Sequence, residues 1–378
     1  MSGGKLTLLR AEGADAARWT AALEGMPGAD IYFTPAYTRL FSELEGDEAI
    51  AALWESTRGR ALFPLQIRSL ARLPFCSPGR LGGRGSTPAY DAASPYGYSG
   101  PLVDAPGGEA PDLIREFTGA LWEELRGRRI VSLFIRFHPL AKNTEYFQVD
   151  GIDPALRSET VYMDLTGAWY KGLTSKCRYE VRKSDRRGAI VEVSEDPDDW
   201  RVFGELYRAT MIHRSARKWY VFPQSFFEET RRLLGRGVFL LVARHAGSLV
   251  AGSLFLQGFG KLHYHLSGAT PEAAGLGVSN RLIVEAARIG EARGATTLHL
   301  GGGLVPGDGL YKYKASFSPL RAVWDKACVV LDREAYADLE EGRRKFLTAR
   351  ADEAVEENPR YFPAYRQGLQ RFMEGRNG

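Results

Sequence analysis

One order of predicted elements occurs twice along the chain, and this repeat constrains the fold more than any other feature. Each half predicts helices, then strands that follow one another directly, then one helix and one further strand. This order is typical of mixed α/β domains and differs from the strict alternation of a Rossmann fold. The first half predicts strand 6–9, helices 14–23 and 35–44, strands 49–55 and 60–67, helix 111–126 and strand 130–137. The second half predicts strand 160–165, helix 175–187, strand 189–193, helices 198–214 and 223–234, strands 238–244, 248–258 and 261–267, helix 278–293, and strands 296–300 and 320–331.

Length and composition agree with two globular domains. The chain has 378 residues, and a domain typically takes about 100–200 residues. Hydrophobic residues make up 44% and charged residues 25% of the chain, which excludes disorder, collagen-like repeats and coiled coil as the main architecture. Gly, Pro and Ser are dense between residues 74 and 108, and so long a loop inside a domain is typical of a functional segment.

Charge and cysteine content set the expected partners and compartment. The net charge of +4 is too small for bulk nucleic-acid binding, so we expect no DNA partner, although a local basic patch remains open. The cysteines, Cys76, Cys177 and Cys328, form no CxxC pair and no Cys/His cluster, which argues against disulfides and a metal site. The N-terminus has no signal-peptide core, and no apolar stretch approaches membrane-spanning length. We therefore expect a soluble, cytoplasmic protein without a transmembrane segment.

The most informative window is residues 263–317. A strand ending at Ser267-Gly268 leads into the loop Ala274-Gly275-Leu276-Gly277, and a helix is predicted to start with Ser279 or Asn280 as its N-cap. Glycines allow close backbone approach, and the free N–H groups of a helix start favour an anion or a polarised carbonyl. The alternative is an ordinary glycine loop beside a capped helix.

Two of the eleven lysines follow the next predicted strand, which ends in Gly301-Gly302-Gly303. They lie in the segment Asp308-Gly-Leu-Tyr-Lys-Tyr-Lys-Ala-Ser-Phe317. If this segment is extended, Lys312 and Lys314 point the same way. The alternative is a solvated strand end with lysine stems packed on tyrosine rings.

These blocks together resemble the Fem-type aminoacyltransferases, the non-ribosomal peptidyl transferases of peptidoglycan cross-bridge synthesis and their relatives. The resemblance rests on the strand ending in His-Leu-Ser-Gly268, the Gly-Gly-Gly strand end and the Asp308–Phe317 segment. It also rests on Ser94-Pro-Tyr-Gly-Tyr-Ser-Gly-Pro101, on Phe134-Ile-Arg-Phe-His-Pro139, and on a basic helix that ends at Gly188. The resemblance implies mixed α/β architecture with two tandem GNAT-like (acyl-CoA N-acyltransferase) domains and a central channel or cleft. The expected first domain is 1–155, on the acceptor side and joined by the C-terminal segment 343–378, and the expected second domain is 156–342, on the donor side.

The resemblance places Tyr313 and Lys314 at the aminoacyl-donor end of that channel. A cation at this position stabilises the oxyanion that forms when an amine attacks an ester or thioester carbonyl. The residues implied to bind the donor are Ser267, Gly275, Gly277, Asn280 and Gly302. The candidates for a base that removes the amine proton are His265, Asp308 and His263; strict alternation places both histidines on one face of their strand. An activated ester needs no dedicated base, so this role stays open.

The first half is expected to supply the acceptor side. Arg136 and His138 lie at the end of an apolar strand, where they either project into a cleft or form an ordinary hydrogen-bonded pair. Tyr96, Tyr98 and Ser99 lie on the Gly/Pro-rich loop and are candidates for a substrate groove. Arg214 resembles a family arginine implied to meet acceptor phosphate, and a guanidinium suits phosphate or carboxylate; Arg217 is the local alternative.

The predicted helix 175–187 is strongly basic. Arg178, Arg182 and Arg186 follow i, i+4 spacing, and Lys176 precedes them. The functional interpretation is a surface for the phosphates of a tRNA acceptor stem, and the alternative is a solvated helix face.

The leading hypothesis is aminoacyl-tRNA-dependent transfer of an amino acid to the amine of a peptidoglycan precursor or a peptide-like small molecule, with no tightly bound cofactor. One alternative keeps the fold and takes acyl-CoA as donor; another is a non-catalytic envelope-pathway binding protein. The sequence resembles the compact branch of the family, because 198–234 has no room for a coiled-coil arm. Segment 32–40 lacks a lysine that some members use near acceptor phosphates, which leaves the acceptor open.

Overall fold

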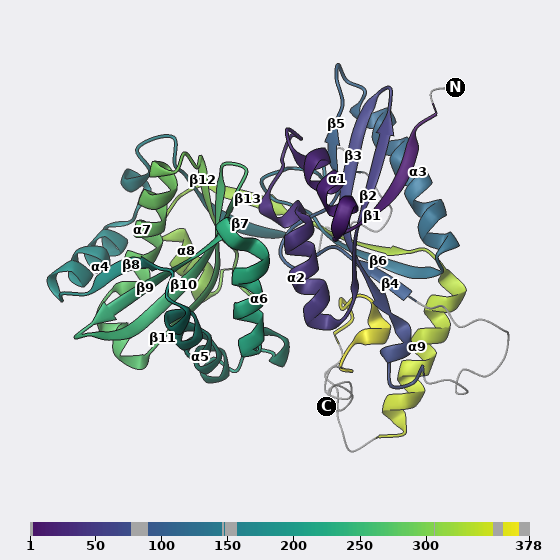
Figure 1. The fold of residues 1–378 in the computed structure, drawn as a ribbon. Helices are drawn as coiled ribbons and strands as arrows, with labels where there is room; N and C mark the ends of the chain where they lie inside the picture. The colour runs from purple at the N-terminus through teal and green to yellow at the C-terminus, as the bar shows by residue number, and fades with distance from the viewer. Residues whose placement is uncertain are drawn as a thin grey trace. The chain divides into compact units, whose positions relative to one another are not determined.

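Two seven-stranded sheets with helices on their faces form the described part of the chain (Figure 1). The computed structural model describes residues 3–76, 90–145, 147, 157–305, 307–350 and 358–369. The chain divides into a first unit, Met1–Arg157 with Trp324–Gly378, and a second unit, Ser158–Val323. The second unit is continuous in sequence. The chain returns to the first unit at Trp324, earlier than the predicted residue 343.

The first sheet has the strand order β1-β2-β3-β4-β6-β14, and β5 pairs with β3. All of these pairs are antiparallel except β4 with β6, which is parallel. Its strands are β1 (Lys5–Arg10), β2 (Glu48–Ser56), β3 (Gly59–Ser69), β4 (Tyr90–Ala93), β5 (Leu102–Asp104), β6 (Ile130–Arg136) and β14 (Lys326–Val330).

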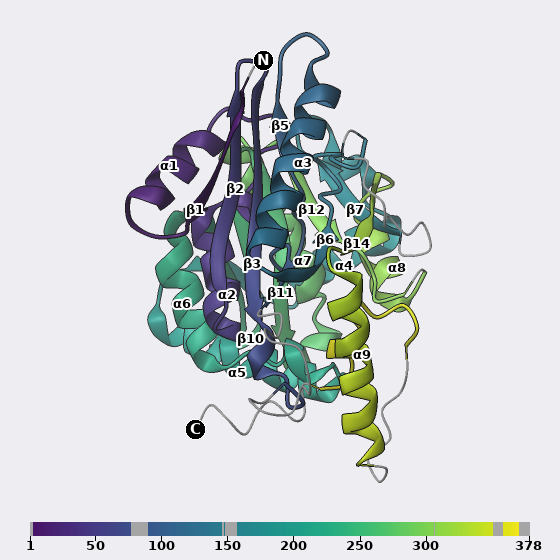
Figure 2. The same cartoon turned by 90° about the vertical axis from the view of Figure 1, so that its right-hand side faces the viewer.

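The helices of the first unit bury apolar residues at helical spacing against this sheet. Leu113, Phe117 and Leu121 lie four residues apart on α3, are fully buried, and pack with Phe63 and Ile135 of the sheet. Figure 2 shows α3 lying along the sheet. A separate cluster holds α9 and the C-terminal segment against the strands. The helices are α1 (Gly13–Leu23), α2 (Pro35–Glu45), α3 (Ala110–Gly127) and α9 (Arg333–Thr348), with 3₁₀ turns at Ile31–Phe33, Leu70–Arg72 and Ala364–Arg366.

A buried carboxylate fastens the C-terminal segment to the first sheet. The Oδ2 atom of Asp91 accepts from Arg366 Nε at 2.6 Å and from the Tyr365 hydroxyl at 2.9 Å. Its Oδ1 atom accepts from Arg68 Nε at 2.8 Å. Burial acts to raise the pKa of Asp91, but the guanidinium groups of Arg366 and Arg68 hold it below its usual value. Asp91 is therefore a charged anchor on which two arginines depend.

The second sheet has the strand order β13-β7-β12-β11-β10-β9-β8. Its parallel pair is β11 with β12. Helices α4 and α7 share one apolar core with the sheet, while α5 and α6 pack on the sheet through different residues (Figure 1). The strands are β7 (Ser158–Asp164), β8 (Ile190–Ser194), β9 (Val238–His245), β10 (Ser248–Gly258), β11 (Lys261–Ala269), β12 (Thr297–Gly301) and β13 (Arg321–Trp324). The helices are α4 (Ser175–Arg186), α5 (Pro197–His213), α6 (Gln224–Leu234), α7 (Val278–Ala292) and α8 (Gly309–Ala315), with 3₁₀ turns at Trp169–Gly172, Lys218–Tyr220, Gly235–Gly237 and Pro271–Gly275.

The predicted mixed α/β fold with one plan used twice is confirmed, and four local predictions need correction. The predicted strand 320–331 is two strands, because the chain leaves the second sheet at Trp324 and enters the first sheet at Lys326. The loop 74–108 contains the short strands β4 and β5, and its part 77–89 lies outside the described residues. Helix α7 has Gly277 as its N-cap instead of Ser279 or Asn280. The segment around Lys314 is helical instead of extended.

Parts of the predicted segment 343–378, at 351–357 and 370–378, also lie outside the described residues. No described helix is long and apolar enough to cross a membrane.

Candidate active site

The parallel strands β11 and β12 of the second sheet pair over only a short stretch. β11 and β12 pair at Lys261–Thr297, Leu262–Leu298 and His263–His299, and β11 continues beyond these pairs to Ala269. The register with β10 shifts where Leu254 faces Leu266 and Phe255 faces Tyr264, which leaves His265 as an extra residue. The strict alternation that placed His263 and His265 on one face is therefore interrupted at this point.

Lys314 lies on α8, close to the end of β12. Its side chain is buried, with 9% exposed, and its Nζ donates to the carbonyl oxygen of Gly302 at 2.8 Å. Burial lowers the pKa of Lys314 to about 8, against an opposing effect of Asp308. Because residues two apart on a helix lie about 200° apart, Lys312 points elsewhere and is exposed. A buried cation with one hydrogen bond to a main-chain oxygen is equipped to stabilise a negative charge that develops beside it.

Asp308 holds this helix in place. Its Oδ1 accepts from Tyr311 N at 2.7 Å, and its Oδ2 accepts from Leu304 N at 2.7 Å and Val305 N at 3.2 Å. The hydrogen bond from Tyr311 is the main cause that lowers the pKa of Asp308. A carboxylate that caps a helix with a lowered pKa is a poor base, so Asp308 positions Lys314 and does not suit proton removal.

Tyr313, which directly precedes Lys314 on α8, carries an unsatisfied hydroxyl. Its ring meets Phe317 edge-on at 5.2 Å, while its buried hydroxyl has no hydrogen-bond partner among the described residues. Burial raises the pKa of Tyr313 well above its usual value; Tyr264 and Cys177 add to the rise, and Arg214 opposes it. A buried polar group normally has a partner, so this hydroxyl is available to a ligand.

Arg214 belongs to the same group of residues. It directly follows α5 and is exposed, and its charge acts to lower the pKa of both Tyr264 and Tyr313. The Tyr264 ring lies 5.9 Å from Lys314 Nζ. The structure thus brings the predicted Lys314, Tyr313 and Arg214 into one neighbourhood around Tyr264.

His265 is a weak candidate for a base. Burial, and then the nearby His263, lower the pKa of His265 to about 3. The imidazole is therefore neutral at pH 7, but its conjugate acid is too strong for efficient proton removal from an amine.

The predicted donor loop is closely covered by α4. Gly277 has a positive φ of 74°, and a Cβ there would lie 2.3 Å from the main-chain oxygen of Glu180 and 3.2 Å from its carboxylate. Asn280 Nδ2 donates to Cys177 Sγ at 3.3 Å, and Ser267 Oγ lies 3.1 Å from Ser253 Oγ. A Cβ at Gly275 would meet nothing within 4 Å. Of this set, Gly275 alone is open, whereas Gly277, Asn280 and Ser267 contact the protein itself.

The basic helix α4 presents most of its predicted residues to solvent. Lys176, Arg182 and Arg186 are exposed, and the Arg186 guanidinium lies 5.7 Å from the Tyr179 ring centroid. Arg178 is half-buried and donates to the carbonyl oxygen of Leu173 just before the helix. Arg178 therefore supports the start of the helix, while the other three form the exposed basic surface.

The predicted acceptor residues of the first unit lie at the end of β6, directly after it, and on the loop after β4. Ser99 N donates to Arg136 O at 2.8 Å, which joins that loop to the strand end. His138 Nδ1 accepts from the main-chain N–H groups of Leu140 and Ala141, and its Nε2 lies 3.3 Å from the buried carboxylate of Asp30. His138 is buried, and these contacts are with the main chain and with Asp30 instead of with Arg136.

Aromatic rings surround the remaining acceptor residues. The Tyr98 ring meets Tyr32 at 5.6 Å and Trp324 at 5.3 Å, and burial raises the pKa of the Tyr98 hydroxyl. The main-chain oxygen of Tyr96 accepts from the Tyr37 hydroxyl at 3.0 Å. These contacts fix the loop that carries both predicted tyrosines.

Comparison with known proteins places this geometry in a fold family. Residues 173–315 match the family described as Acetyltransferase (GNAT) domain. The structure of FemX is similar to this chain with a TM-score of 0.66 and 13% identity, covering 86% of this chain and 98% of FemX. A conserved protein of unknown function from Bacteroides thetaiotaomicron VPI-5482 has a TM-score of 0.54 and 12% identity, covering 87% and 100%. L-PGS from Bacillus licheniformis has a TM-score of 0.50 and 14% identity, covering 86% and 94%. No curated protein matches the sequence.

This chain has the tandem GNAT fold. The predicted resemblance to Fem-type proteins is therefore confirmed at the level of the fold. Within the second GNAT unit, Lys314, Tyr313, Arg214 and Gly302 come together at the end of the parallel pair. Gly302 takes part through its carbonyl oxygen, which accepts from Lys314.

Sequence reasoning missed three residues of the two GNAT units. Glu180 covers Gly277. The Tyr264 ring lies 5.9 Å from Lys314 Nζ, and Tyr264 also acts on the pKa of Tyr313. Lys326 lies opposite Arg136 on the neighbouring strand β14. The scarcity of lysine was a usable signal for Lys326, since the chain has only eleven. Nothing in the local sequence marks Glu180, because its role depends on how α4 meets the start of α7.

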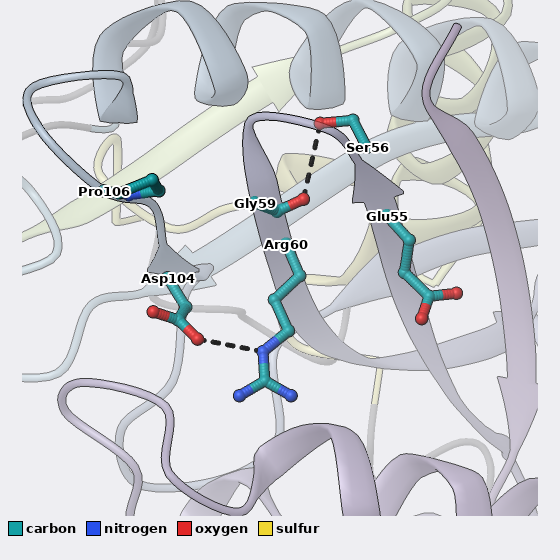
Figure 3. A pocket seen from close by; sticks show the side chains of 6 residues that line it. All are labelled: Glu55, Ser56, Gly59, Arg60, Asp104 and Pro106. Atoms are coloured by element: carbon teal, nitrogen blue, oxygen red, sulfur yellow. Dashed lines mark hydrogen bonds and ion pairs between the residues drawn. The ribbon is translucent and has the colours of Figure 1, made fainter.

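A hollow on the first GNAT unit lies apart from these residues. It measures about 360 Å³ and is lined by Glu55, Ser56, Gly59, Arg60, Asp104 and Pro106 (Figure 3). Arg60 Nε is paired with Asp104 Oδ2 at 3.0 Å, and Ser56 Oγ bonds to Gly59 O. Glu55 is paired with Arg18 outside the hollow, so each charge that lines the hollow has a partner.

Proposed function

We propose that this protein is an amide-forming acyltransferase that transfers an aminoacyl group from an aminoacyl-tRNA to an amine. The observation that carries the proposal is the buried cation of Lys314, hydrogen-bonded to Gly302 O at 2.8 Å. The preceding residue, Tyr313, adds a buried hydroxyl without a hydrogen-bond partner among the described residues. The tandem GNAT fold, which includes an acetyltransferase-type domain over residues 173–315, supports acyl transfer as the reaction class.

The reaction needs charge stabilisation more than it needs a strong nucleophile. The amine nitrogen attacks the ester carbonyl, a C–N bond forms, and the carbonyl electron pair moves to oxygen. Lys314 is placed to stabilise that oxyanion in a low-dielectric setting. When the oxyanion collapses, the ester C–O bond breaks, and the 3′ oxygen of the tRNA leaves with the proton that the amine loses. His265 and Asp308 do not suit the role of base, so the proposal assigns none.

Two features favour tRNA over acyl-CoA as the donor. The carboxylate of Glu180 and the main chain of α4 lie against Gly277, where the pyrophosphate of CoA would require space and positive potential. The exposed surface of the same helix carries Lys176, Arg182 and Arg186, which suit a phosphate backbone. Helix α4 thus leaves little space for the pyrophosphate of CoA at Gly277, while its exposed surface suits the phosphates of a tRNA. Both features favour tRNA as the donor.

The proposed acceptor is an amine of a peptidoglycan precursor or of a peptide-like small molecule. This part of the proposal rests on the likeness of fold to FemX and on the aromatic and cationic residues at the end of β6.

The test is to offer the purified protein two labelled donors with a mixed pool of small amines and peptide amines. One donor is tRNA charged with labelled amino acids, and the other is labelled acetyl-CoA. Each donor is used with and without RNase pretreatment, and acid-stable product is measured. We expect product from charged tRNA only, abolished by RNase and by Lys314→Ala but retained in the exposed-site control Lys312→Ala.

Each other outcome removes a specific part of the proposal. Transfer from acetyl-CoA that resists RNase would overturn the donor assignment and leave the acyltransferase class intact. Product formation from charged tRNA at a normal rate in Lys314→Ala would overturn the role of the buried cation. Absence of transfer from both donors would contradict the enzyme proposal for these acceptors and favour a binding protein.

A further inference from the structure

Glu159, near the start of β7, contacts both elements that hold the Lys314 side chain. Its main-chain oxygen lies against Gly302, where a Cβ would be 2.6 Å from that oxygen. Its carboxylate Oε2 accepts from the hydroxyl of Tyr311 on α8 at 2.8 Å. Gly302 supplies the carbonyl oxygen that accepts from Lys314 Nζ, and α8 carries the lysine. The donor and the acceptor of this hydrogen bond therefore rest on the same residue.

The hydroxyl of Tyr311 lies between an anion and a cation. It donates to Glu159 and accepts from Arg321 Nε of β13, also at 2.8 Å. The Arg321 guanidinium lies 5.5 Å from the centroid of the Tyr311 ring. The described part of the chain shows no direct salt bridge between Glu159 and Arg321, so the hydroxyl links the two charges. Hydrogen bonds to charged groups are about twice as strong as those between neutral groups.

Arg321 also has main-chain contacts of its own. Its NH1 donates to the main-chain oxygens of Ser318 at 2.8 Å and Leu320 at 2.9 Å. The strand that carries it, β13, is the neighbour of β7 in the second sheet. Glu159 and Arg321 thus form a frame on the edge of the sheet, against which the Tyr311 hydroxyl docks.

Helix α8 is too short to hold its own position. It has seven residues, and helices of this length are marginal without contacts to the rest of the protein. Asp308 fixes the first turn through main-chain N–H groups, whereas Lys314 lies in the last turn. Tyr311 and Lys314 are three residues apart and lie on the same side of the helix. A contact at Tyr311 therefore fixes the rotation of α8 and, with it, the direction of the Lys314 side chain.

The link lies near the surface, which separates its effect on position from its effect on stability. Glu159 is exposed, and Tyr311 and Arg321 are half-buried. Exposed charged pairs contribute little to stability. In contrast, a displacement of about 1 Å at a reacting group can lower a rate about a hundredfold. We therefore expect the link to matter for the position of α8 more than for the stability of the unit.

We infer that Glu159, acting through the Tyr311 hydroxyl, is a positioning residue that sets Lys314 against the carbonyl oxygen of Gly302. Its effect on catalysis rests on the proposed function, whereas its effect on the setting of Lys314 does not. Arg321 completes the arrangement, because it donates to the same hydroxyl. The inference adds three residues that act on the reaction through Lys314.

The test is a ¹³C NMR titration of the full chain labelled with lysine carrying ¹³C at Cε, without donor or acceptor. The chain has eleven lysines, and Lys314→Arg identifies the signal of Lys314. Burial lowers the pKa of Lys314 to about 8, Asp308 opposes this effect, and the Tyr264 ring lies 5.9 Å from the ammonium. Tyr311→Phe keeps the ring and removes the hydroxyl. We expect α8 to loosen and water to reach Lys314, so its pKa should rise toward 10.5.

Variants of Glu159 separate the hydrogen bond from the charge. Glu159→Ala should raise the pKa of Lys314 as Tyr311→Phe does. Glu159→Gln should keep it close to the wild-type value, because an amide oxygen also accepts from the hydroxyl. The matched control is Tyr179→Phe on α4, which removes the hydroxyl of an exposed tyrosine and should leave the titration unchanged. Thermal unfolding shows whether each variant is folded.

The transfer reaction supplies a second readout. With charged tRNA as donor, Tyr311→Phe should lower kcat about tenfold to a hundredfold and leave the KM for the donor within a factor of about two. The reason is that the variant misplaces a group that acts during the reaction. A purely structural defect would lower the amount of active protein without moving the titration of Lys314.

An identical Lys314 titration in folded Tyr311→Phe and in the wild type, or an equal shift in Tyr179→Phe, would overturn the positioning role. A wild-type Lys314 that already titrates at 10.5 would do the same. A shift in Glu159→Gln as large as that in Glu159→Ala would show that the charge acts directly and not through the hydroxyl. Because the titration needs no substrate, failure of the transfer reaction leaves it unaffected, and an unchanged titration leaves the transfer reaction standing.

Discussion

The two units share one arrangement of strands and helices, but the cations near their parallel strand pairs lie in different surroundings. Each unit has a parallel strand pair connected through a helix, β4 and β6 through α3 in the first unit and β11 and β12 through α7 in the second. At the end of the second pair, Lys314 is buried against a main-chain oxygen, and its pKa falls to about 8. At the end of the first pair, Lys326 and Arg136 lie half-buried on aromatic rings. Of these cations, the buried one is suited to a charge that develops during a reaction.

Each unit has an aspartate that fixes a segment of the chain, and the two aspartates fix different kinds of segment. In the first unit, Asp91 fastens the C-terminal segment, and two arginines depend on it. In the second unit, Asp308 fastens the loop before α8 through main-chain N–H groups, so that Lys314 has a fixed position. One anchor thus serves the fold of its unit, and the other serves the site.

The first prediction tests the fold anchor and carries the largest expected effect. Asp91→Asn leaves Arg68 and Arg366 without their carboxylate, which should lower the free energy of unfolding of the first unit by about 3–5 kcal/mol. Hydrogen exchange measured peptide by peptide should show faster opening around β4 and the C-terminal segment, with the second unit unchanged. The control is Asp104→Asn, which removes a surface pair with Arg60 and should cost less than about 1 kcal/mol. Equal opening of both units in Asp91→Asn would show that they do not unfold separately.

The second prediction tests the buried cation. Lys314→Ala removes the proposed oxyanion partner and should lower kcat by about 10²–10³-fold. Lys312→Ala, two residues away and exposed, should leave kcat within a factor of about two, since surface substitutions change little. The measurement is single-turnover transfer from charged tRNA. A rate for Lys314→Ala close to that of the wild type would remove the distinction drawn between the two units.

The third prediction concerns pH. Burial lowers the pKa of Lys314 from 10.5 to about 8, so the ammonium is present below that pH and is lost above it. The rate of the chemical step should therefore fall about tenfold per pH unit above that value, once the titration of the acceptor amine is accounted for. Lys314→Arg keeps its charge and should lack this fall. The same descending limb in Lys314→Arg would assign the titration to another group.

The fourth prediction is the smallest and concerns the exposed basic surface of α4. Arg182→Glu combined with Arg186→Glu should weaken tRNA binding and reduce the slope of log K against log salt by about 0.7–0.9 for each tRNA phosphate that the helix no longer neutralises. Arg178 is left intact because it supports the start of the helix. The control is Arg115→Glu on α3 with Arg128→Glu directly after it, in the first unit, both exposed. Equal weakening of binding in the control would indicate a general effect of charge instead of a surface on the second unit.

Local patterns were enough to predict most of the fold. The helix 278–293 and the strands 238–244 and 248–258 agree closely with α7, β9 and β10, because their apolar spacing is regular. Alternating Tyr and Lys at 311–314 was interpreted as extended, although Asp308 three residues ahead is a helix N-cap signal. At this position the cap determines the structure and the alternation does not.

The candidate site was predictable where one motif carries it and unpredictable where distant segments meet. Tyr313 and Lys314 are adjacent in sequence and were found together. Asp91 and Arg366 are 275 residues apart, and no local pattern connects them. Lys326 was missed because one continuous strand was predicted across the point where the chain changes sheets.

The position of β14 in the chain has a consequence for synthesis on the ribosome. β14 is the edge strand beside β6, yet it is translated only after the whole second unit. At about 5–20 residues per second, the nascent first sheet waits on the order of ten seconds with the edge of β6 unpaired. An unpaired edge is a template for pairing with other chains. During synthesis the first sheet is therefore incomplete until β14 has been translated. The second unit is continuous in sequence and can fold as soon as it has left the ribosome.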